Sequence, residues 1–298
     1  MVDSVTAGEV AGHTGPAALL GLGPRAGRPG TPDLLAAHDD GWPLTVRARP
    51  HDIARVNFTS GSSGRPKGCM WTYAALHPMF DPDLWPPEQA RLVADFARCL
   101  VFGSWAMPVM LTFAGRSLLV RGTVVIGADD VRQNLADEIE RHRITGTVTP
   151  VPALRRMLDS LRQRPADLRC LRALVVTGSP ASPQLLAAAV ERLGPVLWQG
   201  YGQSESGMIA LLTPDDLAGL AGMAGHRDRV LTSVGRVLPH VELSVRDRET
   251  GRSVPAGEIG QLFVRHPQMM AGYWGDDAGE TAEVLRDGWL DTRDLGRL

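Results

Sequence analysis

Cysteine, lysine, aromatic side chains and net charge are all scarce in this sequence, and each scarcity argues against a class of protein. The three cysteines, Cys69, Cys99 and Cys170, show no CxxC spacing, which argues against a disulfide framework or a zinc site and suits a reducing cytoplasm. A formal net charge of −2 and an aromatic content of 5% indicate no surface for nucleic acid. There is no apolar run of about 18 residues and no charged-then-apolar start, which predicts neither a membrane span nor a signal peptide. We therefore expect a cytoplasmic protein.

What the sequence does contain is a loop of glycines and hydroxyl side chains beside Lys67, the only lysine among 31 Lys and Arg residues. The loop reads Phe58-Thr59-Ser60-Gly61-Ser62-Ser63-Gly64-Arg65-Pro66-Lys67-Gly68. Backbone N–H groups, hydroxyl donors and one compact positive charge suit a polyphosphate, and glycine lets the backbone approach it closely. The alternative is a flexible turn. A kinase-type or GTPase-type loop would need a hydroxyl residue after the lysine, where this chain has Gly68.

The composition and the periodicity of the sequence change along the chain and predict three parts. Residues 1–50 are rich in Gly, Pro and Ala and predict an irregular lead-in. Residues 51–230 alternate apolar runs with amphipathic stretches, which predicts an α/β core with a largely parallel sheet and flanking helices. Residues 231–298 show period-two alternation and turn signals, which predict an antiparallel β-rich subdomain of the same region.

Within the core, spacing and stop signals predict the individual elements. Ser182 followed by Pro183 predicts a helix start, and Gly194 predicts its end. A further helix is expected over 131–143 behind a cap at Asp129 or Asp130. The other expected helices cover 69–77, 88–100 and the stretch marked by Leu154, Leu158 and Leu161, and the expected strands cover 53–58, 117–125, 144–149, 171–177 and 196–199.

Two loops follow predicted parallel strands, where ligands of such sheets bind. Gly178-Ser179-Pro180 follows the strand that ends at Thr177, and Gly200-Tyr201-Gly202-Gln203-Ser204-Glu205-Ser206-Gly207 follows the strand that ends at Gln199. Taken alone, the first reads as a strand-to-helix turn, and the carboxylate of the second reads as a capping group.

Together these runs resemble the motifs of the adenylate-forming ligases, the superfamily of acyl-CoA synthetases, peptide-synthetase adenylation domains and firefly luciferase. The loop at Lys67 resembles their signature phosphate loop, and Tyr201-Gly202-Gln203-Ser204-Glu205 resembles their aromatic-Gly-x-Thr-Glu motif, with Ser204 in place of threonine. Asp287-Gly288-Trp289-Leu290-Asp291-Thr292-Arg293-Asp294-Leu295-Gly296 resembles their Gly-Trp-x-x-Thr-Gly-Asp-Leu motif, with Arg293 where glycine is common.

The resemblance implies a role for each matching residue. Thr59, Ser60, Gly61, Ser62, Ser63, Gly64 and Lys67 would bind phosphates, and the backbone of Gly178, Ser179 and Pro180 would run along adenine. Tyr201 and Gly202 would also lie against the nucleotide, with the Tyr201 ring stacked on adenine. Ser204 would bind the α-phosphate, Asp294 would bind the ribose hydroxyls, and Glu205 would hold Mg²⁺. Glu205, Ser204 and Lys67 would be the catalytic residues.

The resemblance also implies the reaction, its cofactors and its partners. A carboxylic acid would react with ATP and Mg²⁺ to give an acyl-adenylate, which then passes to coenzyme A or to the phosphopantetheine thiol of a carrier protein. Amino-acid-activating members of the superfamily hold the substrate amine with an aspartate in the pocket region. Because no acidic residue lies between Phe96 and Met110, the resemblance favours a fatty or other amine-free acid over an amino acid. The match runs from about Phe58 to Gly296, and the chain stops at Leu298, where the hinge and mobile lid domain of the superfamily would begin. We therefore expect an AMP-binding domain of an acyl-CoA synthetase, truncated at both ends and without the lid lysine, which another chain or a longer native protein would have to supply.

Two alternatives remain open from the sequence. One is a truncated, weakly active or inactive remnant that binds nucleotide without turnover. The other is a domain that keeps only the fold and serves in protein–protein contact, which predicts no affinity for ATP. Turnover separates the first alternative from an active ligase, and ATP binding separates the second from both.

Overall fold

A computed structural model describes residues 47–59, 66–103, 107–127, 131, 134–218, 229–276 and 279–298. The chain divides into two compact units, residues 1–48 and residues 49–298, and the architecture given below is that of the second. Residues 1–46 of the predicted lead-in lie outside the described residues.

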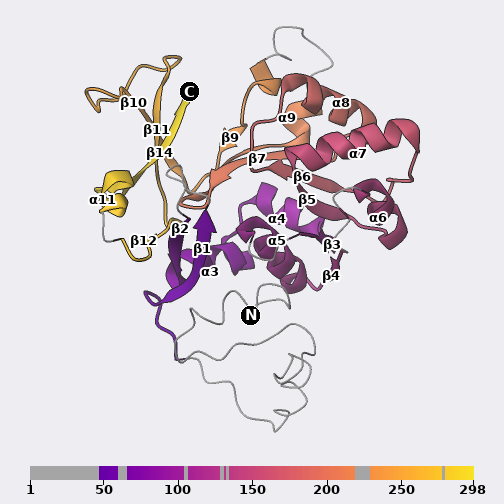
Figure 1. Cartoon of the computed structure of the whole chain (residues 1–298), viewed down its shortest axis with the longest axis horizontal. Helices are drawn as coiled ribbons and strands as arrows, with labels where there is room; N and C mark the ends of the chain where they lie inside the picture. The colour runs from indigo at the N-terminus through magenta and orange to yellow at the C-terminus, as the bar shows by residue number, and fades with distance from the viewer. Residues whose placement is uncertain are drawn as a thin grey trace. The chain divides into compact units, whose positions relative to one another are not determined.

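A seven-stranded sheet with the strand order β4-β3-β5-β6-β7-β8-β9 forms the centre of this unit (Figure 1). Strands β4, β3, β5, β6 and β7 pair in parallel, whereas β8 and β9 add to the sheet as antiparallel strands. The strands are β3 (Arg98–Val101), β4 (Thr123–Ile126), β5 (Gly146–Pro150), β6 (Ala173–Thr177), β7 (Leu197–Gln203), β8 (Gly207–Leu212) and β9 (Arg236–Val237).

Helices connect the parallel strands and cover both faces of the sheet. Helix α5 leads from β3 to β4, toward one edge of the sheet, whereas α6, α7 and α8 lead toward the other edge. Because crossovers between parallel strands are right-handed, α5 lies on the opposite face of the sheet from α6, α7 and α8. Helix α4 packs with α5, and α6 packs with α7 (Figure 1). The helices are α3 (Tyr73–Phe80), the short 3₁₀ helix η1 (Pro82–Leu84), α4 (Pro87–Ala94), α5 (Pro108–Leu119), α6 (Leu135–His142), α7 (Val151–Gln163), α8 (Pro183–Leu193) and α9 (Pro214–Ala218).

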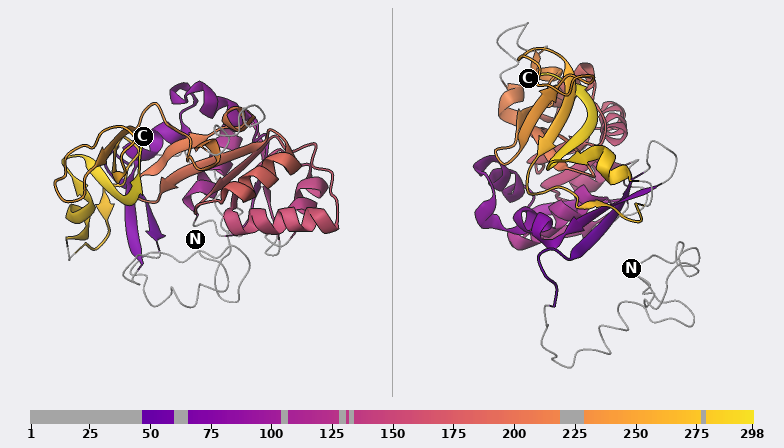
Figure 2. Two further views of the ribbon diagram at one scale, coloured as in Figure 1. Left: turned by 90° about the horizontal axis from the view of Figure 1, so that it is seen from above. Right: turned by 90° about the vertical axis from the view of Figure 1, so that its left-hand side faces the viewer.

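Two smaller antiparallel sheets complete the unit (Figure 2). The three-stranded sheet joins β1 (Ile53–Thr59) and β2 (Lys67–Thr72) to β12 (Gly272–Tyr273), which comes from far along the chain. The four-stranded sheet has the order β10-β11-β14-β13, and the short helix α11 (Glu280–Val284) precedes β13. Its strands are β10 (Glu242–Arg246), β11 (Gly260–Arg265), β13 (Leu285–Arg286) and β14 (Trp289–Gly296).

The buried apolar side chains form two clusters. The first lies around the parallel strands and their helices and includes Leu100, Leu154 and Trp198. The second includes Trp71 and Leu290 and joins the two small sheets to β8. The second cluster includes residues of β2 and β14, the strands that carry Lys67 and Asp294.

The predicted fold class is confirmed: a largely parallel sheet with flanking helices and a C-terminal antiparallel β subdomain. Helix α8 begins and ends where the sequence predicts, because the Ser182 hydroxyl accepts a hydrogen bond from the backbone N of Leu185 at 3.3 Å and Gly194 follows the last turn with φ 77°. The predicted division at residue 230 stays a prediction.

Several predicted element boundaries are wrong. The stretch 69–77 is strand β2 followed by helix α3, 88–100 is helix α4 followed by strand β3, and 117–125 is the end of α5 followed by β4. Helix α6 begins at Leu135 rather than at Val131, and the predicted caps Asp129 and Asp130 lie outside the described residues. In each of the first three cases an apolar run continues through a change of element, so periodicity gives no boundary.

Across the described ranges, no helix has the length and the apolar character that crossing a membrane would require.

Candidate functional site

The turn that carries Ser204 and Glu205 lies at the carboxyl end of β7. The sequence predicts a loop directly after Gln199, but β7 continues to Gln203 and turns back into β8 at Gly207. The register of the hairpin shifts between Tyr201 and Gly202, and a Cβ at Gly202 would collide with the carbonyl oxygen of Gly207. Glycine is therefore required at residue 202 for the turn to close.

Two hydrogen bonds from other parts of the chain hold the backbone of this turn. The indole Nε1 of Trp71 in β2 donates to the carbonyl oxygen of Ser204 at 3.0 Å. The backbone N of Met270 donates to the carbonyl oxygen of Glu205 at 2.8 Å. The three-stranded sheet and the segment that leads into β12 thus both hold the backbone of the turn.

The Glu205 carboxylate is held by a phenol and lies against a thiol. Tyr273 Oη donates to Glu205 Oε1 at 2.9 Å, and Cys69 lies opposite Tyr273 in the three-stranded sheet. Burial, the charge of Glu205 and a hydrogen bond with its side chain together raise the pKa of Cys69 to about 12. Burial, followed by the charge of Glu205, also raises the pKa of Tyr273. Both groups keep their protons at neutral pH, so the thiol is no nucleophile and the phenol stays a donor.

The predicted adenine and ribose residues meet in a hydrogen bond. Tyr201 Oη donates to Asp294 Oδ2 at 2.7 Å, although the two residues lie on β7 and β14. The backbone N of Asp294 donates to Thr292 Oγ1 at 3.1 Å, and that hydroxyl donates to the carbonyl oxygen of Leu262 at 2.9 Å. Burial, and then the hydrogen bond to Asp294, raise the pKa of Tyr201, so its phenol remains protonated.

Arg293, which stands where the resembling motif has glycine, adopts the glycine conformation. Its φ is 61°, in the left-handed region that side chains rarely occupy. The register between β11 and β14 shifts at this point, from Gln261 opposite Leu295 to Phe263 opposite Asp291. A bulge of this kind redirects side chains, and here Asp294 lies within it.

The phosphate loop is described only at its two ends. Thr59 ends β1, pairs with Lys67 at the start of β2, and its hydroxyl lies 3.5 Å from the Lys67 carbonyl oxygen. The predicted phosphate ligands between them, Ser60, Gly61, Ser62, Ser63 and Gly64, lie outside the described residues.

The Lys67 ammonium has a protein partner. Its Nζ lies 2.8 Å from Glu280 Oε1 and 5.2 Å from the centre of the Tyr273 ring. The side chain is only 12% exposed, so a phosphate would approach an ammonium that is already partly neutralised.

The turn at Gly178 is open to solvent at the carboxyl end of β6. Gly178 has a φ of 90°, no atom within 4 Å of a Cβ built on it, and exposed neighbours in Ser179 and Pro180. The Thr177 hydroxyl donates to the carbonyl oxygen of Gly200 at 2.9 Å, which ties the ends of β6 and β7 together. Within the described part of the chain, no hydrogen bond or ion pair joins Gly178–Pro180 to Tyr201, Glu205 or Asp294.

The carboxylate of Glu205 suits a magnesium ion that is already bound to a nucleotide. In the described ranges, no three His, Cys, Asp or Glu side chains gather as metal ligands. Mg²⁺ commonly binds one or two carboxylates together with phosphate oxygens. Glu205 therefore suits a metal ion whose other ligands come from a triphosphate and water.

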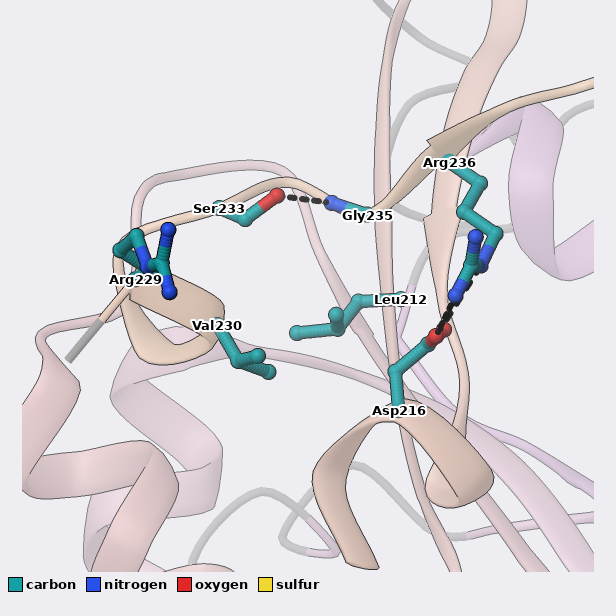
Figure 3. Close-up of a pocket in the computed structure, with 7 residues that line it drawn as sticks. All are labelled: Leu212, Asp216, Arg229, Val230, Ser233, Gly235 and Arg236. Carbon is teal, nitrogen blue, oxygen red and sulfur yellow. Dashed lines mark hydrogen bonds and ion pairs between the residues drawn. The ribbon is translucent and has the colours of Figure 1, made fainter. Parts of the chain in front are cut away.

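An open pocket of about 340 Å³ lies beyond the far end of β8, away from these residues (Figure 3). In it, Arg236 Nη2 pairs with Asp216 Oδ1 at 3.0 Å, and the Ser233 hydroxyl accepts a hydrogen bond from the backbone N of Gly235 at 3.0 Å. Because these polar groups satisfy one another and none of the predicted site residues lines the pocket, we assign it no part in the chemistry.

The sequence assigned no role to two residues that contact the site, although Gly272-Tyr273-Trp274 matches the lead-in to the Asp294 motif of the superfamily. Tyr273 holds Glu205, and Glu280 holds Lys67. Neither residue type indicates a contact with the site by itself, because each gains its role from a partner distant in the sequence.

Comparison with known proteins places these features in a family. The family model described as AMP-binding enzyme matches residues 23–274. A feruloyl-CoA synthase from an Amycolatopsis species is 32% identical over 270 residues, which cover 88% of this chain and 50% of the relative. A medium/long-chain-fatty-acid–CoA ligase from Mycobacterium tuberculosis is 31% identical over 267 residues, which cover 86% of this chain and 42% of the relative.

Solved structures agree with this match. The amide bond synthetase McbA from Marinactinospora thermotolerans superposes with a TM-score of 0.80 and 34% identity over 99% of this chain and 56% of its own. The ATP-bound MatB from Rhodopseudomonas palustris gives a TM-score of 0.69 and 25% identity over 85% of this chain and 47% of its own. The chain thus spans about half the length of the relatives it matches, and it belongs to the family of AMP-binding enzymes.

Proposed function

We propose that this chain forms the nucleotide-binding core of a ligase that joins a carboxylic acid to AMP, for later transfer to a thiol. The observation that carries the proposal is the 2.7 Å hydrogen bond from Tyr201 to Asp294. The motifs that resemble the adenine-binding and ribose-binding motifs are 93 residues apart, and this bond brings them within the span of one nucleoside.

In the proposed reaction the carboxylate of the acid attacks the α-phosphorus of ATP and pyrophosphate leaves. Positioning and charge neutralisation dominate such chemistry. Ser204 would contact the α-phosphate and the Thr59–Lys67 loop would contact the outer phosphates. Tyr201 would stack on adenine, along which the backbone of Gly178–Pro180 would run. One oxygen of Asp294 already accepts from Tyr201, and the carboxylate is exposed to receive the ribose hydroxyls.

Glu205 is the residue that would hold Mg²⁺. When bound, the ion neutralises charge that develops on the phosphate oxygens. Glu205 contributes a carboxylate whose turn is fixed through Trp71 and Met270, so little reordering is needed on binding.

The acid is proposed to lack an amine and to be aromatic or fatty. The segment from Phe96 to Met110 has no acidic side chain that could hold a substrate ammonium. The names of the relatives point the same way, since they include feruloyl-CoA synthase, indoleacetate–CoA ligase and a fatty-acid–CoA ligase. The proposed acceptor is the thiol of coenzyme A or of a carrier-protein phosphopantetheine.

A second candidate is a chain that binds nucleotide without turnover. The observation that favours it is the ion pair between Lys67 and Glu280. Lys67 is the only lysine of the 298 residues, and its ammonium is occupied. If no other chain or segment supplies a cation to the reacting carboxylate, loss of such a contact costs roughly a hundredfold or more in rate.

Calorimetry with Mg²⁺ and ATP tests both candidates at once. We expect the wild-type chain to bind, and Glu205→Ala and Asp294→Ala to weaken binding at least about tenfold. Glu191→Ala, an exposed change on α8, is the matched control and should bind as the wild type does. No binding at millimolar ATP would reject both candidates and favour a fold used only for protein contact.

Turnover then separates the two candidates. A pyrophosphate-exchange screen of aryl and fatty acids should give acid-dependent exchange if the chain is an active ligase. Binding without exchange for any acid would support the nucleotide-binding remnant.

A further inference from the structure

The Glu205 side chain has a built hydrogen-bond partner that the predicted mechanism does not use. Tyr273 is 7% exposed, and its hydroxyl lies 2.9 Å from Glu205 Oε1. The two residues are 68 positions apart, and β12 brings them together by pairing with β2. A buried phenol is a rigid donor with few rotatable bonds, so it holds an acceptor in a defined place.

Tyr273 is itself held through its backbone and contacted at its ring. Its backbone N donates to Thr281 Oγ1 at 2.9 Å, at the start of α11. The Lys67 ammonium lies 5.2 Å from the ring centre and is fixed by Glu280, the residue before Thr281. The first turn of α11 is in turn bound to Asp276, which accepts from the backbone N of Glu280 at 2.6 Å and of Thr281 at 2.7 Å. The phenol has therefore little freedom to follow a moving carboxylate.

We propose that Tyr273 is a positioning residue that orients the Glu205 carboxylate for magnesium. The inference rests on the proposed function, because it needs a nucleotide-bound metal at Glu205. Without the phenol, the carboxylate would have to give up rotamer freedom each time the metal binds. Groups that orient metal ligands in this way typically contribute about 10- to 100-fold in metal affinity.

The test compares ATP binding with and without metal for Tyr273→Phe, which removes one hydroxyl and keeps the ring. Calorimetry with Mg²⁺-ATP should show binding weakened about tenfold. Calorimetry with ATP and a chelator should show no change, because the contacts of the nucleotide itself are untouched. Tyr73→Phe is the matched control, since Tyr73 is 48% exposed at the start of α3 and should bind as the wild type does in both conditions.

A double-mutant cycle gives the second readout. If Tyr273 acts through Glu205, adding Tyr273→Phe to Glu205→Gln should change Mg²⁺-ATP affinity no further. Additive losses in the cycle, or equal losses with and without metal, would assign Tyr273 a purely structural role and overturn the inference.

The wild-type arm distinguishes the two proposals. Wild-type binding of Mg²⁺-ATP with an unaltered Tyr273→Phe variant rejects the positioning role alone. Failure of the wild-type chain to bind Mg²⁺-ATP rejects the proposed function and the positioning role with it.

Discussion

His266 is a buried histidine that the proposed chemistry does not use. It is 7% exposed, and its Nδ1 accepts a hydrogen bond from the backbone N of Gln268 at 3.3 Å. Burial, and then the charge of the neighbouring His240, lower its pKa to about 4, while a backbone contact with Ser206 acts in the opposite direction. The pKa of His240 is lowered by burial and by the charge of Arg116. The folded chain therefore keeps His266 neutral well below pH 6.5, the ordinary midpoint of histidine.

This difference predicts a loss of stability in mild acid. Because the folded-state pKa is depressed, the unfolded chain takes up the proton first as the pH falls below about 6.5. The contribution of His266 is fully present above that pH and falls by about 1.4 kcal/mol per pH unit until about pH 4. Urea unfolding across this range should therefore show a steeper pH dependence for the wild type than for His266→Gln.

The control for this prediction is His77→Gln, since the His77 side chain is 65% exposed. It should keep the wild-type slope. Equal slopes for the wild type and His266→Gln would show that His266 is protonated as easily in the folded chain as in the unfolded one.

At the scale of elements, the bulge in β14 forms the part of the site that holds Asp294. Arg293 takes φ 61° there, and its guanidinium lies 3.0 Å from Glu283 in an exposed ion pair. A residue with a side chain costs roughly 1–2 kcal/mol in the left-handed region, where glycine adopts this conformation freely. Part of this difference is offset, because glycine loses more conformational freedom on folding. The surface ion pair returns little of that cost.

We expect Arg293→Gly to be more stable than Arg293→Ala by about 1 kcal/mol. Both variants lose the ion pair with Glu283, so the difference between their free energies of unfolding reports the cost of the left-handed backbone alone. The free energy of unfolding from urea titrations is the measurement, and an alanine variant as stable as the glycine variant would contradict the argument. ATP affinity should be the same in both variants if the bulge keeps its shape.

The predicted bounds of an element are correct where local signals define its ends, and wrong where only distant strand pairing defines them. Helix α8 has an N-cap at Ser182, a proline at its first position and a terminal glycine, and each of these acts within a few residues. Strand β2 has no such local signal. Its run from Cys69 to Trp71 is as apolar as a buried helix, and it is a strand because β1 and β12 pair with it.

At the scale of the whole molecule, residues 49–298 form one compact unit that contains two buried clusters. Leu154 on α7 belongs to the first cluster and Leu290 on β14 to the second, and both are 0% exposed. If the unit unfolds cooperatively, a cavity in either cluster should destabilise both.

We therefore expect Leu154→Ala and Leu290→Ala each to cost about 2–5 kcal/mol and to shift one shared unfolding transition. Differential scanning calorimetry on the full chain checks this. Leu84→Ala, at a leucine that is 54% exposed, should change stability by less than about 0.5 kcal/mol. A second transition that moves in only one of the two core variants would mean that the clusters unfold separately.

The sequence by itself determined the order of the motifs, the alternation of strands and helices in the core, and the types of residue at the candidate site. These features depend on composition and spacing over short distances, which local physics converts directly into turns, caps and strand ends. Tyr201, Glu205 and Asp294 were recognisable for the same reason, since each lies in a short run of characteristic residues.

Only the tertiary structure decided which of these groups touch. The pairing of Lys67 with Glu280, of Tyr273 with Glu205, and of Tyr201 with Asp294 joins residues that are distant in the sequence. Such contacts arise from strand pairing and from the closing of a common core, and spacing along the chain carries no record of either. The sequence therefore identifies the candidate chemical groups, whereas strand pairing and core packing determine how they are oriented and what holds them in place.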